Sequence, residues 1–288
     1  AARHRGGAPR YAPEGRRSGV DPCQRNPARG GCMRTPPDLY QDAELYDALH
    51  AGYRDDIAFY RNLALDNPGR VLEIGAGTGR ITLELARLAE ELVALEPADA
   101  LHAPLRARLA QKSSELHAPA TVVATTLESY ARDRRDESFD LIVAPFHVVM
   151  HLFTLDQQDA FFHAARALVA EDGMLAFDVA APPVGVLEGV PRRELASILP
   201  DGTNRAVTRI QSYDPTSQVL TSRFEVDEID PDGRMKRRFV TLTQRTYGRF
   251  ELERAVLTAG FQRVRTWGDF DRRPVEASSV RFVVTAQP

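Results

Sequence analysis

The stretch that decides the fold runs from residue 70 to residue 80 and reads Arg70-Val71-Leu72-Glu73-Ile74-Gly75-Ala76-Gly77-Thr78-Gly79-Arg80. Its apolar run, 71–74, predicts a buried strand, and the apolar spacing of residues 81–88 predicts a helix. Three alternate glycines between them permit unusual φ/ψ angles and let a ligand approach the backbone closely. The start of the helix adds unpaired N–H groups and the positive end of its dipole. The stretch therefore predicts a site for a nucleotide-type cofactor.

The spacing of the glycines and a second acidic residue narrow the kind of cofactor. The dinucleotide fingerprint is G-x-G-x-x-G, but here Arg80 stands at the place of its last glycine and Gly79 comes one residue early. The next apolar run, 92–95, ends at Glu96. A carboxylate at the tip of the second strand, roughly 20 residues after the glycine turn, is placed to accept hydrogen bonds from a ribose diol.

Glu73, the three glycines and Glu96 together resemble the signature of class I S-adenosylmethionine (SAM) dependent methyltransferases. The resemblance implies that Gly75, Gly77 and Gly79 line the methionine and ribose part of SAM. It also implies that Glu96 binds the ribose hydroxyls and that Glu73 acts near the amino group, through water or the loop backbone. Many relatives carry Gly-Asp after the third strand, where this chain has Thr125 and Thr126. The other cofactor-binding residues that the resemblance implies are Pro97, Thr125, Thr126, Leu127, Ala144, Phe146 and Tyr46.

The composition excludes several classes of partner. Residues 1–32 contain seven Arg, six Gly and four Pro but no Leu, Ile or Phe, which predicts a disordered extension. This segment also holds the chain's two cysteines, Cys23 and Cys32. The remaining residues carry a net charge of −8, so we expect no nucleic-acid partner. No apolar run approaches the length of a membrane span, and we expect no membrane partner and a cytoplasmic location.

The alternation of strands and helices predicts an α/β domain. Apolar runs mark strands at 71–74, 92–95, 121–124, 139–144, 174–179, 261–267 and 280–286. With the helical stretches between them, they predict a Rossmann-like, seven-stranded, mostly parallel sheet with helices on both faces. Residues 39–65 are predicted to form one helix before the first strand. Residues 205–246 instead alternate with period two, which predicts about three antiparallel strands. We therefore expect a SAM-binding domain of residues 33–185 and 247–288, and an inserted β lid of residues 186–246.

The segment after the fourth strand bears on the substrate. Its Pro145-Phe146 and His151-Leu152 pairs resemble a bacterial group of small-molecule methyltransferases that includes aminosugar N,N-dimethyltransferases and glycine N-methyltransferase, which use a β insertion as a lid. His147 and His151 lie four residues apart at the edge of the sheet where ligands bind. Either is a candidate general base or substrate ligand. Two histidines hold a metal only weakly without a third ligand, so no metal site is predicted.

Aromatic and basic residues supply further candidates. Tyr46 and Tyr53 lie on the expected N-terminal helix, where one of them could cover the sulfonium by a cation–π contact, or both could pack in the core. Arg209 and Arg245 lie on the inserted strands, where they could bind an anionic group of the substrate or face solvent. We list His147, His151 and Tyr53 as catalytic candidates and His147, Arg209 and Arg245 as substrate ligands.

The sequence as a whole predicts an enzyme that transfers a methyl group from SAM to a small molecule, with an amine nitrogen as the first choice of acceptor. O-methylation of a hydroxyl or carboxylate is the alternative, and a non-catalytic SAM-binding protein is an alternative of another class. The glycine spacing disfavours an NAD-dependent oxidoreductase. Ala144-Pro145-Phe146 stands where many nucleic-acid methyltransferases have an Asn/Asp-Pro-Pro-Tyr type motif. The sequence leaves a homodimer possible.

Overall fold

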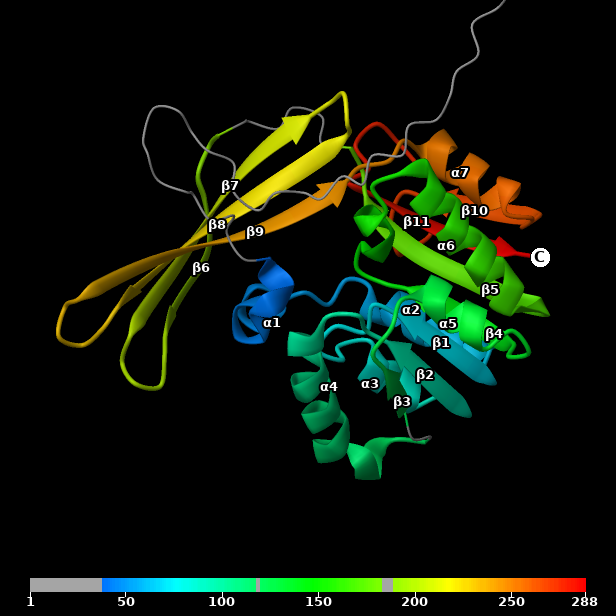
Figure 1. Cartoon of the computed structure of the whole chain (residues 1–288), viewed down its shortest axis with the longest axis horizontal. Coiled ribbons are helices and arrows are strands. Elements are labelled where there is room, and N and C mark those ends of the chain that lie inside the picture. Colours follow the sequence, from blue (N-terminus) through cyan, green and yellow to red (C-terminus); the bar gives the residue numbers. More distant parts are fainter. Residues whose placement is uncertain (1–37, 118–119, 183–188) are drawn as a thin grey trace, which may run out of the picture. The chain divides into compact units, whose positions relative to one another are not determined.

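A seven-stranded sheet carries the glycine turn in the computed structural model, which describes residues 38–117, 120–182 and 189–288 (Figure 1). The strand order is β10-β11-β5-β4-β1-β2-β3. The strands are β1 (Arg70–Ile74), β2 (Glu91–Leu95), β3 (Ala120–Val123), β4 (Phe139–Ala144), β5 (Val169–Ala180), β10 (Arg263–Trp267) and β11 (Arg281–Gln287). Neighbours pair in parallel except at β11, which is antiparallel to both β5 and β10. The predicted fold class is confirmed, whereas the predicted extension 1–32 lies outside the described residues.

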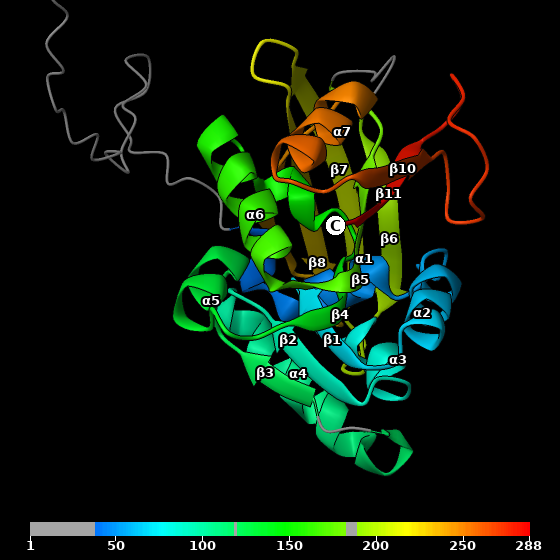
Figure 2. The ribbon, with the colours of Figure 1, turned by 90° about the vertical axis from the view of Figure 1, so that its right-hand side faces the viewer.

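The helices of the chain cover both faces of this sheet. They are η1 (Leu39–Gln41), α1 (Ala43–His50), α2 (Ile57–Asp66), α3 (Thr82–Ala86), α4 (Asp99–Gln111), η2 (Ser113–Glu115), α5 (Leu127–Asp133), η3 (Val148–His151), α6 (Leu155–Leu168) and α7 (Arg249–Thr258). Because side chains alternate along a strand, Leu72 packs in the cluster with α5, α6 and α7, while Val71 packs in the cluster with α2 and α3. Figure 2 shows α5 and α6 on one side of the sheet and α2 and α3 on the other.

The single helix predicted over residues 39–65 is wrong, because the chain turns between two helices. Asp42 caps α1 by accepting a hydrogen bond from the N–H of Leu45 (2.9 Å). After His50 the chain turns through Ala51-Gly52, and α2 begins only at Ile57. The break lets α1 leave the sheet domain and pack its buried Leu45 against the inserted strands.

Strand β5 begins earlier than predicted. The chain enters the strand at Val169, directly after α6, and not at residue 174. The pairing with β4 is irregular between Phe139 and Leu141. A Cβ on Gly173 would lie 2.9 Å from the carbonyl oxygen of Phe139, so only glycine permits this close approach.

The insertion is an antiparallel sheet of four strands, whereas the alternation predicted about three. The strands are β6 (Arg192–Ile198), β7 (Asn204–Asp214), β8 (Val219–Ile229) and β9 (Met235–Arg245), in that spatial order. The unpredicted β6 is an exposed edge strand, so its sequence lacks the apolar alternation of a half-buried strand. Val207, Phe224 and Val240 on one face of the sheet pack against Leu45 of α1.

Candidate functional site

The glycine turn after β1 has the backbone that only glycine adopts readily. Gly75, Gly77 and Gly79 all have positive φ, at 71°, 58° and 94°. The N–H groups of Gly75 and Ala76 both donate to the carbonyl of Leu95 at the end of β2 (2.8 and 3.0 Å). A Cβ on Gly75 would also overlap Cγ2 of Val148 in η3. The turn is therefore fixed between the ends of β2 and η3.

Gly77→Ala is expected to lower the free energy of unfolding by about 1–2 kcal/mol, the usual cost of a left-handed backbone for an L-residue. The added methyl group would lie only 3.3 Å from the hydroxyl of Tyr46, which must move slightly. Urea unfolding followed by circular dichroism measures the change. Gly52→Ala is the control, because Gly52 has no neighbour within 4 Å. An equal effect of the two substitutions would contradict the requirement for glycine at 77.

Glu96 directly follows β2 and is only 5% exposed. One carboxylate oxygen accepts the N–H of Gly77 and the other accepts the N–H of Ala98, both at 2.7 Å. Burial raises the pKa of Glu96, and these two backbone donors oppose the rise. The carboxylate is thus held rigidly beside the glycine turn, with lone pairs left to accept hydrogen bonds from a ligand.

A cavity of about 680 Å³, here called the larger cavity, opens above Glu96 at the carboxyl ends of the central strands. Most of the predicted cofactor-binding residues line it: Tyr46, Gly75, Gly77, Glu96, Pro97, Thr125, Thr126, Leu127 and Phe146. Three others do not: Ala144 is fully buried in β4, Gly79 packs close to Leu105 of α4, and Glu73 lines a second cavity described below. Thr126 also caps α5, a helix that the sequence analysis did not predict, by accepting the N–H of Ser129.

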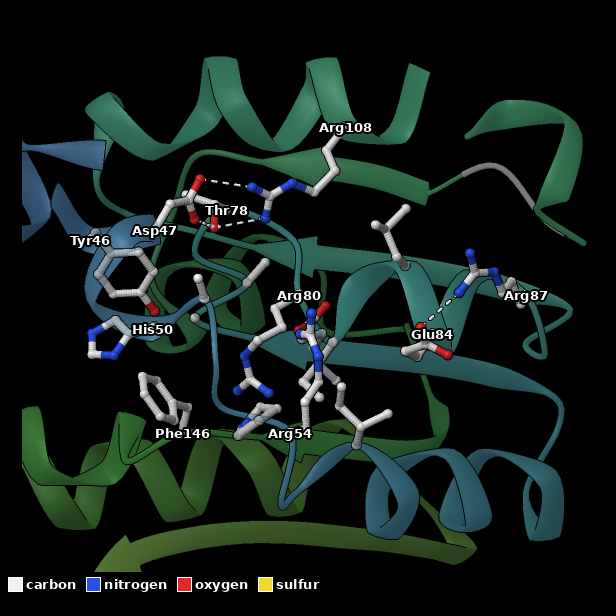
Figure 3. Close-up of a pocket in the computed structure, with 18 residues that line it drawn as sticks. Tyr46, Asp47, His50, Arg54, Thr78, Arg80, Glu84, Arg87, Arg108 and Phe146 are labelled. Atoms are coloured by element: carbon white, nitrogen blue, oxygen red, sulfur yellow. Dashed lines mark hydrogen bonds and ion pairs between the residues drawn. The ribbon is translucent and has the colours of Figure 1, made fainter. Parts of the chain in front are cut away.

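A second cavity of about 500 Å³, here called the smaller cavity, adjoins the larger one. The two share Tyr46, Gly75, Pro145 and Phe146 in their walls. In Figure 3, Tyr46, His50 and Phe146 lie together on one side of Arg80. The two cavities therefore meet at the glycine turn, beneath α1.

Glu73 lines the smaller cavity from the end of β1. It is 1% exposed, and burial raises its pKa to about 8, although Thr82 and the positive charge of Arg80 oppose the rise. Its Oε2 is buried without a hydrogen-bond partner among the described residues. An unpaired buried oxygen beside the glycine turn is compatible with the indirect role at the cofactor's amino group that the resemblance implies.

Arg80 organises the floor of the smaller cavity, a role that the sequence analysis did not assign to it. Its guanidinium donates to both carboxylate oxygens of the fully buried Asp56, at 2.5 and 2.7 Å. The same guanidinium lies over the rings of Tyr53 (5.1 Å) and Phe146 (4.9 Å). Its position directly after the last glycine, in the turn that lines the site, was the available signal.

Of the two predicted histidines, His151 lines the larger cavity and His147 lines neither cavity. His151 Nε2 lies 2.8 Å from the hydroxyl of Tyr40. His147 precedes η3 with a left-handed backbone (φ 70°), and its Nδ1 lies 3.0 Å from the carboxylate of Asp178. His50 of α1, which was not predicted from the sequence, lines the smaller cavity and lies edge-on against Phe146. His50 and His151 thus line the two cavities, and His147 stacks on the ring of Phe146, which both cavities share.

Burial lowers the pKa of both cavity histidines to about 4. For His50 the positive charge of Arg80 lowers the pKa further. A neutral imidazole keeps a lone pair on one ring nitrogen. At neutral pH, His50 and His151 are therefore hydrogen-bond acceptors as well as donors.

Stability is expected to fall as pH drops from 6.5 to 4, because the unfolded chain takes up the His50 proton there and the folded chain does not. His50→Gln should flatten this part of the profile. We expect the free energy of unfolding lost between pH 7.5 and pH 4.5 to be smaller in His50→Gln than in the wild type, by on the order of 2 kcal/mol. One pKa unit corresponds to about 1.4 kcal/mol, and solvent screens part of the effect. Urea unfolding of both proteins at pH 4.5 and 7.5 measures it. An unchanged difference between the two pH values would contradict a neutral His50.

The remaining predicted catalytic and substrate residues, Tyr53, Arg209 and Arg245, are not among the residues that line the two cavities. Tyr53 packs against Phe146 (5.0 Å between ring centres) and lines neither cavity. Arg209 pairs with Glu194 (3.0 Å), and its charge contributes to the low pKa of His50, so it lies toward the site. Arg245 also lines neither cavity; it donates to Gln218 and Glu251 at the base of the insertion.

The described residues contain no group of three or more His, Cys, Asp or Glu side chains arranged to hold a metal ion. Among the helices of residues 38–117, 120–182 and 189–288, none has the length and apolar character to cross a membrane.

Comparisons with known proteins agree with the cofactor site. Residues 71–173 match the family model described as "Methyltransferase domain". The chain is 24% identical over 257 residues to YqeM of Bacillus subtilis (strain 168), a methyltransferase by name, covering 86% of this chain and 97% of that protein. The solved structure of the CcbJ methyltransferase from Streptomyces caelestis superposes with a TM-score of 0.70 at 22% identity, covering 87% of this chain and 98% of that one.

A second solved structure contains the cofactor. SAM-bound CalS10, an amino pentose methyltransferase from Micromonospora echinaspora, superposes with a TM-score of 0.66 at 18% identity, covering 85% of this chain and 97% of that one. At these identities the superpositions establish a common fold. The matched family model spans the glycine turn and Glu96, the residues whose geometry suits a ribose-containing cofactor. Residues 71–173 therefore form a methyltransferase domain; the protein is a SAM-dependent methyltransferase, and SAM is its cofactor.

Proposed function

We propose that the protein methylates an amine nitrogen of a small molecule, with amino sugars as the first class of acceptor to test. One observation carries the proposal: two cavities meet at Tyr46 and Phe146, and each is lined by a neutral histidine, His50 in the smaller cavity and His151 in the larger. The likeness to CalS10, an amino pentose methyltransferase involved in calicheamicin biosynthesis, supports this acceptor class and a role in secondary metabolism.

On the cofactor side, bound SAM would supply an electrophilic methyl group, to whose carbon an acceptor lone pair would bond as the C–S bond breaks and S-adenosylhomocysteine leaves. We assign the ribose hydroxyls to Glu96, whose carboxylate is already oriented by Gly77 and Ala98. The other residues assigned to SAM are Glu73, Gly75, Gly77, Gly79, Pro97, Thr125, Thr126, Leu127, Ala144 and Phe146. Tyr46 covers the glycine turn and is assigned to the sulfonium.

On the substrate side, the chain must bring the acceptor nitrogen into line and accept its proton. Alignment of donor and acceptor lowers the activation barrier by on the order of 7–11 kcal/mol at best. An amine attacks only when neutral, so a nearby imidazole that takes its proton assists the reaction. We assign the role of proton acceptor to His147. His151 is assigned as a hydrogen-bond acceptor and Arg209 as a ligand for a polar group of the substrate. The insertion, residues 186–246, is proposed to act as the lid.

The test is a methylation assay with SAM and a matched panel of acceptors. Each amino sugar is paired with the analogue that carries a hydroxyl in place of the amine, and mass spectrometry detects the gain of one methyl group. We expect products from the amines alone. Methylation of the hydroxyl analogues or of sugar acids instead would replace the proposal by O-methylation. SAM binding without any product across the panel would count against amino sugars as the acceptor class.

A further inference from the structure

A buried carboxylate connects three parts of the chain beneath the shared wall of the two cavities. Asp178, near the carboxyl end of β5, is 0% exposed. Its Oδ1 accepts the hydroxyl of Tyr60 (2.7 Å) and the backbone N–H of Phe146 (2.8 Å). Its Oδ2 lies 3.0 Å from Nδ1 of His147. Burying an ion is costly unless it is paired, so the Asp178 carboxylate depends on these partners and in turn fixes their positions.

The carboxylate and the imidazole depend on each other. Oδ2 of Asp178 and Nδ1 of His147 are both buried and lie 3.0 Å apart, within ion-pair distance, and neither has a separate hydrogen-bond partner of standard geometry among the described residues. A carboxylate oxygen can only accept, so the proton between the two atoms belongs to Nδ1. In the neutral ring the lone pair then lies on Nε2. Because the His147 side chain is 22% exposed while Nδ1 is buried, its exposed part is on the side of the ring away from Asp178.

The same carboxylate also holds the backbone that carries the imidazole. Phe146 and His147 both have positive φ, at 59° and 70°, which is strained for residues other than glycine. The hydrogen bond from the N–H of Phe146 to Asp178 stabilises this left-handed turn. The turn presents the ring of Phe146 to both cavities, with the ring of His147 stacked on it at 5.4 Å. His147 is also close enough to His50 and His151 that a positive charge gained on its ring would lower the pKa of each.

We propose that Asp178, supported by Tyr60, is a positioning residue that holds His147 as the Nδ1–H tautomer, so that Nε2 accepts the proton of the acceptor ammonium. The inference rests on the proposed function. In this step the N–H bond of the ammonium breaks, its electron pair stays on the nitrogen and the proton passes to Nε2. The neutral amine then has the lone pair that methylation requires.

Asp178→Asn tests the proposal with little change in shape. The asparagine carbonyl can still accept from Tyr60 and Phe146, but its NH₂ group would donate to Nδ1 of His147 and move the ring proton to Nε2. Nitrogen-15 NMR of the histidine rings at neutral pH is expected to show Nδ1–H for His147 in the wild type and Nε2–H in the variant. We expect kcat for amine methylation to fall about 100-fold or more, within the range of general-base effects. The SAM affinity measured by calorimetry should not change.

Further variants keep the test independent of folding. His147→Gln assigns the His147 resonances and should lower kcat as much as Asp178→Asn does. Tyr60→Phe removes one donor to Asp178 and should lower kcat less. His163→Gln is the matched control, because this exposed histidine on α6 contacts only the carbonyl of Asp159.

The outcomes separate this inference from the proposed function. An Nε2–H tautomer in the wild type, or an unchanged kcat in a folded Asp178→Asn protein, would overturn the positioning role. An Asp178→Asn protein that loses kcat and SAM affinity together would also overturn it, since that result indicates general damage to the site. A wild type with the expected tautomer that methylates no amine would instead count against the proposed function.

Discussion

Glu96→Ala is expected to weaken SAM binding by a factor of about 100 or more. The two carboxylate oxygens are fixed by the N–H groups of Gly77 and Ala98, so they meet a ribose diol without having to reorganise. A hydrogen bond to a charged acceptor contributes about 1.5–3 kcal/mol. Two of them correspond to roughly a hundredfold to ten-thousandfold in Kd. The substitution also leaves the two backbone N–H groups without their acceptor, which loosens the glycine turn.

Isothermal calorimetry with SAM measures the effect. The Kd of Glu96→Gln for SAM should lie between those of the wild type and Glu96→Ala, because the amide keeps one acceptor oxygen. Glu90→Ala is the control, since Glu90 lies exposed just before the same strand and lines neither cavity. A Kd for Glu96→Ala equal to that of the control would refute the ribose role. No heat with either SAM or S-adenosylhomocysteine in the wild type would contradict the cofactor assignment itself.

Arg80→Ala is expected to lower the free energy of unfolding by about 3–5 kcal/mol, the usual result of removing one partner of a buried ion pair. Asp56 is 0% exposed, and its carboxylate has both hydrogen bonds from Arg80. Without the guanidinium, the carboxylate stays buried and unpaired, and the rings of Tyr53 and Phe146 lose the cation between them. We therefore also expect the turn at Phe146 to loosen and the SAM affinity to fall.

Urea unfolding measures the loss of stability. Arg87→Ala is the matched control, because Arg87 lies in the same region and pairs with Glu84 and Glu115 at the surface. Such exposed pairs contribute about 0–1 kcal/mol. A double variant, Arg80→Met with Asp56→Leu, removes both charges and should recover most of the lost stability. If it is as unstable as Arg80→Ala, the unpaired charge is not the cause.

The parts of the fold that were predicted correctly are those with a strong local pattern. The strand at 139–144 was predicted with the residues it has in the structure, because both of its faces are covered and its sequence is almost continuously apolar. The helix at α7 ends before Gly260, whose φ of 99° explains why glycine follows the helix. Strand β6 and the break between α1 and α2 were missed, because neighbouring elements decide them and the local sequence does not.

The same division holds within the site. Most of the predicted cofactor residues meet around one cavity, because strand ends at the same edge of a parallel sheet converge. Asp178 had the same signal as Glu96, an acidic residue at the end of an apolar run, and was not singled out. His50 and Tyr60 carried no such signal. Their positions depend on where α1 and α2 cross the sheet, and Tyr60 meets Asp178 across 118 residues of chain.

By itself the sequence determined the cofactor chemistry: a strand, three glycines of unusual backbone and a carboxylate one strand later are local features that adjacent residues specify. Only the tertiary structure decided which side chains meet around the two cavities. Arg80 pairs with Asp56, Asp178 holds the turn at Phe146 and His147, and His50 of α1 packs against Phe146 on the wall that the two cavities share. These contacts join separate segments of the chain, and they form because a buried charge must be paired and buried rings must pack, which no local sequence pattern specifies.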